Sequence, residues 1–283
     1  MTFVLRSPDE LKAFIKARKS QGQSIGFVPT MGALHEGHLT LARASKREND
    51  VTVCSVFVNP AQFNNADDLK NYPRTEKNDT DMLGKVGCDA VFIPSAQDMY
   101  PQEKPTLGFD FGQAERVMEG RFRPGHFNGV GIIVSKLFNM VSPDKAYFGE
   151  KDFQQLAIIR ILAKELCFGI DIIGVPTVRE TDGLAMSSRN RRLTDEERQI
   201  APDIYKILTE AKKDAKEGAS LKDVKESVLR KFAKSEALDL EYFEIVNADS
   251  LQPIENWCDA ERAQACVAAF LGQVRLIDNI NLK

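Results

Sequence analysis

Hydrophobic and polar positions follow two alternating patterns over the N-terminal part of the chain. Short, nearly continuous apolar runs, typical of strands buried on both faces, alternate with longer stretches typical of amphipathic helices. The runs that predict strands are Ile25–Pro29, Val51–Val58, Asp89–Pro94, Lys145–Phe148 and Ile170–Val175. The stretches that predict helices are about His38–Asn49, Glu76–Val86, Val130–Val141 and Lys151–Cys167. An earlier helix is predicted from Ser7, because Ser-Pro-Asp-Glu is a capping pattern and an apolar periodicity follows it.

This alternation predicts an α/β protein with a Rossmann-like, doubly wound parallel sheet. We expect proline to end the first long strand at Pro29. Ligands bind such sheets at the carboxyl ends of the strands. The polar loops after Val28, Val58 and Phe148 are therefore expected to face one crevice.

The pattern changes after Leu193. A charged helix is predicted from Thr194 to about Glu217, and a second helix over Leu221–Ser235. Two or three strands are then predicted, at Leu240–Val246, Gln264–Leu271 and Val274–Ile280. Helices followed by a small antiparallel sheet indicate a separate, smaller α+β domain. We therefore divide the chain into residues 1–180 and residues 181–283.

Composition narrows the class of protein. The net charge of −3 gives no bulk attraction to nucleic acid. The cysteines number five, and no C-x-x-C pair occurs, which indicates a reducing compartment and no structural zinc. The N-terminus lacks the profile of a signal peptide, and no apolar run approaches the length of a membrane span. We expect a soluble, cytoplasmic protein.

The segment Pro29–His38, PTMGALHEGH, is the strongest chemical signal. It lies between a predicted strand and a predicted helix, where backbone N–H groups and the helix dipole favour an anion. His35 and His38 there can donate to phosphate oxygens and to charge that develops on a leaving pyrophosphate. The alternatives are two incidental histidines or a metal pair, and the second is disfavoured because no further His or Cys cluster accompanies them. The third histidine, His126, lies in a glycine-rich segment, and none of the three occupies a position typical of an apolar core.

Two further segments add polar groups before or after apolar runs. Asn59 and Gln62 in FVNPAQF offer amides suited to a hydroxyl-bearing or carboxylate substrate, and Tyr72-Pro73-Arg74 follows them. The alternative is a proline turn with polar caps. Arg121–Gly131, RFRPGHFNGVG, combines arginines, a histidine and glycines ahead of a helix, an arrangement that can hold an anion or form an exposed basic loop.

The last two segments carry further charged and hydroxyl groups. In YFGEKDFQQL, Lys151 can bind a phosphate and Asp152 can accept ribose hydroxyls, unless Asp152 only caps a helix. Gln154 and Gln155 are adjacent on that helix, so at most one faces the same ligand. In Asp182–Asn190, two serines and an arginine predict either a mobile loop that closes over a triphosphate or a simple linker.

Taken together, these motifs resemble those of the pantothenate synthetases (pantoate–β-alanine ligases), within the HIGH-type nucleotidylyltransferase superfamily. The resemblance rests on PTMGALHEGH, FVNPAQF, YPR, RPGHFNGV, YFGEKDFQQL and DGLAMSSRN, and extends from about Gly26 to Leu193 and more faintly beyond. It implies a ligase of pantothenate and coenzyme A biosynthesis. ATP and pantoate would give pantoyl-adenylate and pyrophosphate with Mg²⁺, and β-alanine would then displace AMP. Residues 1–180 would bind ATP and pantoate, and residues 181–283 would act as a lid.

The resemblance also implies roles for single residues. His35 and His38 would contact the ATP phosphates and the transition state. The other implied phosphate contacts are Lys151, Ser187, Ser188 and Arg189, and the ATP site would also include Pro29, Met31, Gly149, Asp152 at the ribose, and Met186. Pantoate would bind at Gln62 and Gln155, with Met31 lining the pocket. Further candidate site residues are Asn59, Tyr72, Arg123 and His126.

The chain departs from the family at one loop and leaves two rival functions. After Phe63 it has Asn64-Asn65-Ala66-Asp67-Asp68 where the family commonly has glycine or proline and glutamate, so a metal role of these aspartates is open. The rivals are a nucleotidylyltransferase acting on another small acceptor and a non-catalytic nucleotide-binding module. The family resemblance implies a homodimer, and we expect no nucleic-acid or membrane partner.

Overall fold

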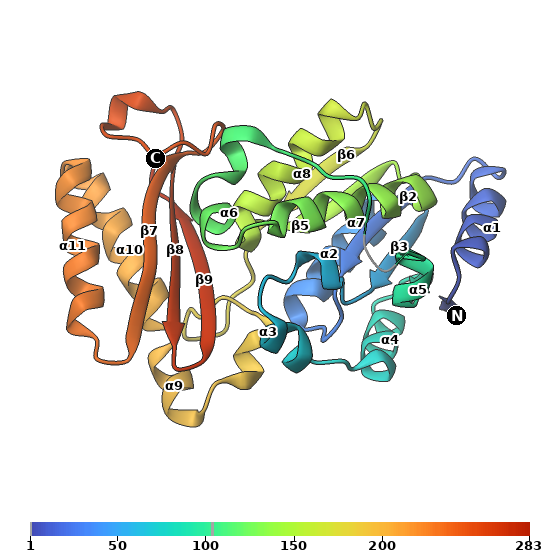
Figure 1. Cartoon of the computed structure of the whole chain (residues 1–283), viewed down its shortest axis with the longest axis horizontal. Helices are drawn as coiled ribbons and strands as arrows, with labels where there is room; N and C mark the ends of the chain where they lie inside the picture. Colours follow the sequence, from blue (N-terminus) through green and yellow to red (C-terminus); the bar gives the residue numbers. More distant parts are fainter. Residues whose placement is uncertain (1, 103–104) are drawn as a thin grey trace. The chain divides into compact units, whose positions relative to one another are not determined.

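The structure is a computed structural model that describes residues 2–102 and 105–283. The chain forms two compact units (Figure 1). Unit 1 comprises Met1–Phe111, Arg123–Glu150 and Gln155–Pro176. Unit 2 comprises Gly112–Phe122, Lys151–Gln154 and Thr177–Lys283. Two short stretches from earlier in the chain therefore belong with the C-terminal residues.

Unit 1 is built on a six-stranded parallel sheet with the order β1-β4-β3-β2-β5-β6. The strands are β1 (Phe3–Leu5), β2 (Ile25–Thr30), β3 (Val51–Val56), β4 (Ala90–Phe92), β5 (Lys145–Gly149) and β6 (Asp171–Val175). The order runs outward from β2 in one direction through β3 and β4, and in the other through β5 and β6. The switch point therefore lies between β2 and β5, where doubly wound sheets bind ligands.

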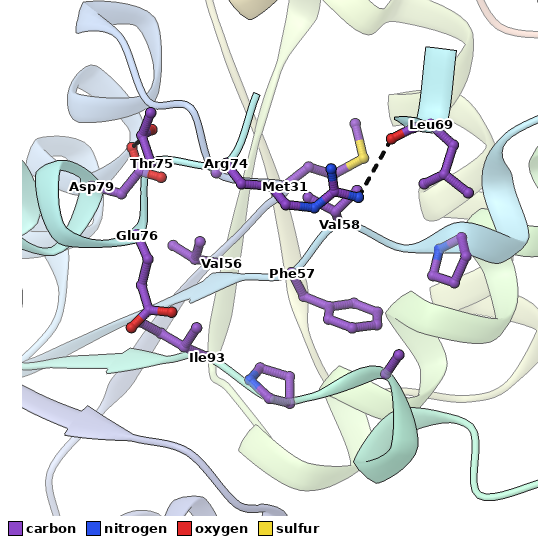
Figure 2. Close-up of a pocket in the computed structure, with 14 residues that line it drawn as sticks. Met31, Val56, Phe57, Val58, Leu69, Arg74, Thr75, Glu76, Asp79 and Ile93 are labelled. Atoms are coloured by element: carbon purple, nitrogen blue, oxygen red, sulfur yellow. Dashed lines mark hydrogen bonds between the residues drawn. The ribbon is translucent and has the colours of Figure 1, made fainter. Parts of the chain in front are cut away.

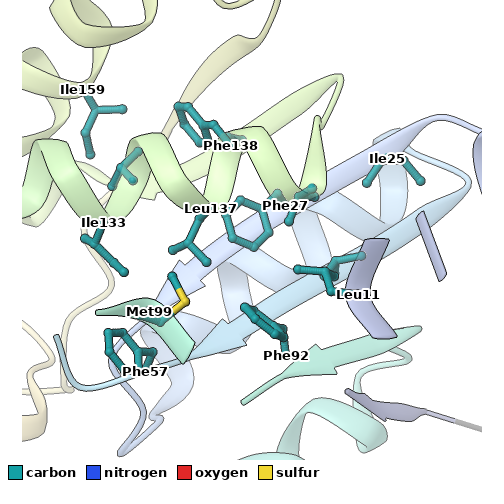
Figure 3. Packing of buried hydrophobic residues seen from close by; sticks show 14 of the residues in the cluster. Leu11, Ile25, Phe27, Phe57, Phe92, Met99, Ile133, Leu137, Phe138 and Ile159 are labelled. Carbon is teal, nitrogen blue, oxygen red and sulfur yellow. The ribbon is translucent and has the colours of Figure 1, made fainter. Parts of the chain in front are cut away.

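Helices cover both faces of this sheet. The helices of unit 1 are α1 (Pro8–Lys19), α2 (Glu36–Glu48), α3 (Ala66–Asn71), α4 (Glu76–Lys85), α5 (Ala96–Met99), α7 (His126–Val141) and most of α8 (Phe153–Glu165). Phe27 and Phe92 lie on one face and pack with Leu137 of α7, as Figure 3 shows. The opposite face carries Val28 and Val91, which pack with residues of α2 and α4. Side chains that alternate between two covered faces explain why the strands are apolar throughout.

Unit 2 contains a three-stranded antiparallel sheet, β7 (Leu238–Asn247), β8 (Ala263–Leu271) and β9 (Val274–Asn281). Its helices are α6 (Met118–Phe122), α9 (Asp195–Ile200), α10 (Asp203–Lys216) and α11 (Leu221–Lys234). Figure 1 shows α10 and α11 beside this sheet, and their apolar faces pack on it in one buried cluster. The fold-class prediction, a doubly wound parallel sheet followed by a smaller α+β part, is confirmed.

Several predicted elements need correction. Pro29 does not end β2, because the strand continues to Thr30 with Pro29 paired to Ser55 of β3. Pairing of β2 with β5 covers only Gly26 and Phe27, so the N–H that proline lacks is not needed on that side. The charged helix predicted after Thr194 is two helices, α9 and α10, separated at Pro202. The edge strand β1 has only three residues and was missed.

Within the described residues, no helix combines the length and the apolar character needed to cross a membrane.

Candidate active site

The loop between β2 and α2 places two histidines at a helix N-terminus. His35 is the N-cap residue of α2, and His38 lies in its first turn. Their rings lie 4.1 Å apart between centroids, tilted by 45°. The backbone N–H of His35 approaches Nδ1 of His38 at 3.4 Å. Because a backbone N–H only donates, Nδ1 of His38 is the acceptor, and the neutral ring carries its proton on Nε2.

Asp79 of α4 holds this loop in place. Its carboxylate is fully buried and accepts the backbone N–H groups of Ala33, at 2.9 Å, and Leu34, at 2.8 Å. Thr75 donates its hydroxyl to the same carboxylate at 3.0 Å. Gly32 and Ala33 both have left-handed backbone, with φ of 81° and 51°, and for alanine this conformation is strained. The clamp therefore stabilises a tight turn that the chain would otherwise avoid.

Sequence reasoning missed Asp79, which lies in an ordinary helical pattern more than forty residues from the loop that it holds. In the sequence, Asp79 appears only as an acidic residue near the start of a predicted helix, where solvent-exposed carboxylates are also common.

A buried amide network fixes the Gln62 side chain. Asn59, 1% exposed, donates from Nδ2 to Oε1 of Gln62 at 3.0 Å and to the carbonyl of Gly129 at 3.1 Å. Its Oδ1 accepts from the Ala61 N–H at 3.3 Å and from the Tyr100 hydroxyl at 2.6 Å. All four hydrogen-bonding positions of Asn59 are thus used inside the protein. Asn59 is positioned to orient Gln62 rather than to bind a ligand itself.

Two further contacts hold Gln62, one at its side-chain nitrogen and one at its backbone carbonyl. Its Nε2 donates to Sδ of Met31 at 3.0 Å, and its backbone carbonyl lies 2.8 Å from Nδ1 of His126. Arg123 Nη1 lies 3.3 Å from Nε2 of His126. Gly129 allows this approach, because a Cβ there would lie 2.2 Å from the Ala61 carbonyl oxygen.

One alternative predicted for Arg121–Gly131, an exposed basic loop, is wrong at His126. It is 5% exposed and begins α7, so it is a buried histidine and not part of an exposed loop. Its ring packs against Phe127 with 5.0 Å between centroids. Tyr72 is buried as well and meets Phe63 edge-on at 5.7 Å.

A cavity of about 430 Å³ opens at the carboxyl ends of β2, β3 and β4 (Figure 2). Its walls include Met31, Phe57 and Ile93, and the side chain of Arg74 extends across it. Arg74 donates to the carbonyls of Tyr72, at 3.2 Å, and of Leu69, at 3.4 Å. Met31 is shared between this cavity and the Gln62 network, so the cavity adjoins the amide of Gln62.

In unit 2, the segment with Ser187, Ser188 and Arg189 follows a small hairpin. The Met186 N–H donates to the Val178 carbonyl at 3.0 Å, and Arg179 bridges to Ala185. Ser187 caps a 3-10 helix, Ser188–Arg192, by accepting the Arg189 N–H at 3.3 Å. The predicted loop is thus partly helical.

The base of this hairpin is tied to the sheet of unit 2. Arg179 forms a bidentate pair with Asp278 of β9, at 2.6 and 2.9 Å. The guanidinium carbon of Arg179 also lies 3.6 Å from the ring centroid of Tyr205 in α10. Together these contacts hold the base of the hairpin, and so the start of the segment with Ser187 and Ser188, against β9 and α10.

The turn after β5 carries the remaining candidates. Gly149 ends β5, and Lys151 and Asp152 lie in a 3-10 turn ahead of α8. Asn279 donates to the Lys151 carbonyl at 2.8 Å, within unit 2. Gln154 is buried, and its amide donates to the carbonyls of Ala114 and Val117 at 2.8 and 2.9 Å. Because Gln154 is committed to these bonds, Gln155 is the glutamine of the pair that can face a ligand.

Known proteins place the chain in a family. A family model described as Pantoate-beta-alanine ligase matches residues 3–281. The chain belongs to the pantoate–β-alanine ligase family. It is therefore an enzyme that joins pantoate to β-alanine with ATP, a ligase of pantothenate biosynthesis. This decides against the two rival functions that the sequence left open.

Relatives and solved structures of this family match the whole chain. A pantothenate synthetase of Phocaeicola vulgatus is 51% identical over 275 residues, covering 97% of each chain. The crystal structure of pantothenate synthetase from Thermus thermophilus superposes with a TM-score of 0.93 at 39% identity, covering 99% of each chain. A pantoate–β-alanine ligase structure from Francisella tularensis, complexed with β-γ ATP and β-alanine, has a TM-score of 0.82 at 34% identity and covers 100% of this chain and 98% of that one.

Proposed function

We propose that this ligase works in two steps through a free-standing pantoyl-adenylate. In the first step, a carboxylate oxygen of pantoate attacks the α-phosphorus of ATP, and the bond to the bridging oxygen of pyrophosphate breaks. In the second step, the amine of β-alanine attacks the acyl carbon, loses a proton, and AMP leaves with the oxygen of the broken C–O bond. Neither step needs a covalent bond to the enzyme.

The observation that carries this proposal is the pair His35 and His38 at the N-terminus of α2, beside the switch point of the sheet. Two imidazole rings and a positive helix end supply donors where negative charge develops on departing pyrophosphate. We propose that further phosphate contacts come from Lys151, Ser187, Ser188 and Arg189. Asp152 would bind the ribose, and Pro29, Met31, Gly149 and Met186 would complete the nucleotide site.

Pantoate is proposed to bind at Gln62 and Gln155, against Met31. Support comes from the Gln62 amide, which is buried, oriented and adjacent to a cavity whose walls are mostly apolar, although Arg74 and Glu76 also line it. An oriented amide holds a hydroxyl or a carboxylate, and apolar walls exclude water from a mixed anhydride.

Mg²⁺ would enter with the ATP phosphates. Among the residues that the structure describes, no group of three or more His, Cys, Asp or Glu gathers as a metal site. Mg²⁺ is usually held by one or two carboxylates together with substrate phosphates and water, so it does not require such a group. When bound, the ion would neutralise charge on the phosphate oxygens. A homodimeric assembly is proposed on the resemblance alone, and a cytoplasmic location on the reduced cysteines that the sequence indicates.

The test is exchange of labelled pyrophosphate into ATP. We expect exchange with ATP and Mg²⁺ that requires pantoate and does not require β-alanine, because adenylation is a separate and reversible first step. Exchange that appeared only after β-alanine was added would show a concerted reaction and remove the free-standing intermediate.

A further inference from the structure

Tyr100 lies behind the proposed acid site and contacts it through one residue. It follows the short helix α5, is 5% exposed, and its hydroxyl lies 2.6 Å from Oδ1 of Asn59. Its ring packs near Phe57, 6.5 Å between centroids, and the ammonium of Lys136 lies 4.6 Å from the ring centroid. Nothing in the sequence pattern marks this tyrosine as functional.

The directions of the hydrogen bonds in this network can be assigned without ambiguity. The Gly129 carbonyl only accepts, so the Asn59 atom facing it is the nitrogen. The Ala61 N–H only donates, so the Asn59 atom facing it is the oxygen. The Tyr100 hydroxyl, facing the same oxygen, must therefore be a donor. Burial raises the pKa of Tyr100 to about 12, so the proton remains on the hydroxyl at neutral pH.

The same logic fixes Gln62. Because Nδ2 of Asn59 donates to it, the Gln62 atom facing Asn59 is Oε1. Nε2 of Gln62 then lies on the other side, and it donates to Met31 at the cavity edge. The Met31 sulfur is a weak acceptor that a substrate oxygen can replace. A reversed amide would present a carbonyl oxygen and repel a carboxylate.

We propose that Tyr100 is a positioning residue for the acid substrate: through Asn59, its hydroxyl helps to keep Gln62 turned with Nε2 toward the ligand. This inference rests on the proposed binding of pantoate at Gln62. Without the hydroxyl, Asn59 loses its shortest hydrogen bond, and its amide is held by the 3.1 Å bond to the Gly129 carbonyl and the long 3.3 Å bond from Ala61.

The experiment is the substitution Tyr100→Phe, which removes one oxygen and keeps the ring. We expect the KM for pantoate to rise about five- to tenfold, the usual effect of one lost buried hydrogen bond, with the KM for ATP changed less than about twofold. Tyr147→Phe is the matched control. Tyr147 is also fully buried, and its hydroxyl bonds Asn49 at 2.8 Å and Glu48 at 3.0 Å, away from Gln62. Both variants should lose stability, but only Tyr100→Phe should change the KM for pantoate.

A double-mutant cycle with Gln62→Met separates positioning from general packing. If Tyr100 acts through Gln62, Tyr100→Phe should have almost no further effect on the KM for pantoate once the amide is gone. A full additional effect in the Gln62→Met background would overturn the inference. So would an unchanged KM for pantoate in Tyr100→Phe while Gln62→Met is impaired, and in that case the proposed role of Gln62 would stand. An unchanged KM in Gln62→Met itself would instead remove the acid-site assignment, and this inference with it.

Discussion

The imidazole rings of His35 and His38 lie together at the N-terminus of α2. The His35 ring sits at the cap position and the His38 ring packs on it. His38 accepts through Nδ1, so in the neutral ring Nε2 is the nitrogen that carries the proton. Such fixed donors stabilise a transition state because they need no reorganisation as charge develops.

We expect His35→Ala and His38→Ala each to slow adenylation by about 10²–10³-fold, the usual loss for one transition-state donor. Single-turnover formation of pantoyl-adenylate is the measurement. Thr40→Ala is the control on the same helix, since the Thr40 hydroxyl donates to the Glu36 carbonyl one turn earlier in α2. A histidine variant within about threefold of wild type would have no catalytic role.

At the residue scale, the sequence indicates which side chains are candidates for the site, but not their burial or their hydrogen-bond partners. His35, His38 and Gln62 were named from local motifs, because motifs fix chemistry and approximate place. Whether Asn59 faces a ligand or another amide depends on Gly129 and Tyr100, which are distant in the chain. The same applies to His126, whose burial comes from the packing of α7 on residues 61 and 62.

Among the elements, α4 has a function that its amphipathic pattern does not reveal. It contributes Leu83 to the core and Asp79 to the turn before α2. The turn needs support because Ala33 has a positive φ, which costs a non-glycine residue about 1–2 kcal/mol. Helix α4 thereby sets where α2 begins, and so where the two histidines lie.

Asp79→Asn should test this clamp. The amide keeps the shape but turns an N–H toward a backbone N–H, which should lower the free energy of unfolding by about 1–3 kcal/mol. Misplacement of the loop should also slow adenylation by about 10- to 100-fold. Denaturant unfolding and single-turnover assays measure the two effects.

The control for Asp79→Asn is Asp81→Asn in the same helix. Asp81 pairs with Lys77 in an exposed ion pair, so its loss should be nearly neutral. Equal behaviour of the two variants would mean that the loop does not depend on Asp79.

Element boundaries show where local pattern suffices. The capping box at Ser7 was predicted and is present, because both of its bonds lie within one turn. The predicted end of β2 at Pro29 was wrong. A proline can lie inside this strand because β5 stops pairing with β2 before Pro29. The break between α9 and α10 was missed although Pro202 was visible, because acidic and basic residues continue a helical pattern on both sides of it.

For the whole molecule, the main structural fact is that unit 2 is assembled from three separate stretches. Glu119 of α6 accepts two hydrogen bonds from Arg275 of β9, both at 2.8 Å, and one from the Tyr242 hydroxyl at 2.8 Å. Burial lowers the pKa of Arg275, but Glu119 and Glu241 more than offset this and raise it overall. The sequence could not predict this contact, because α6 and β9 share no local pattern.

Glu119→Ala should lower the free energy of unfolding by about 3–5 kcal/mol, because it removes one of the two carboxylates that pair with a largely buried guanidinium and the acceptor of the buried Tyr242 hydroxyl. The contrast is Arg262→Ala, which breaks the exposed pair of Arg262 with Asp249 and should cost less than about 1 kcal/mol. Chemical denaturation of both variants gives the comparison. Similar losses would show that the Glu119 pair contributes no more than a surface contact.

The bidentate bond between Glu119 and Arg275 also bears on how this protein can change by recombination. The two partners lie 156 positions apart. A genetic exchange with a crossover anywhere between them joins one parent's carboxylate to the other parent's β9. Offspring are expected to survive only when both parents carry a compatible pair, so the two positions should be inherited together. Transfer of the stretch from Thr177 onward by itself is therefore expected to separate Arg275 from the carboxylate of Glu119.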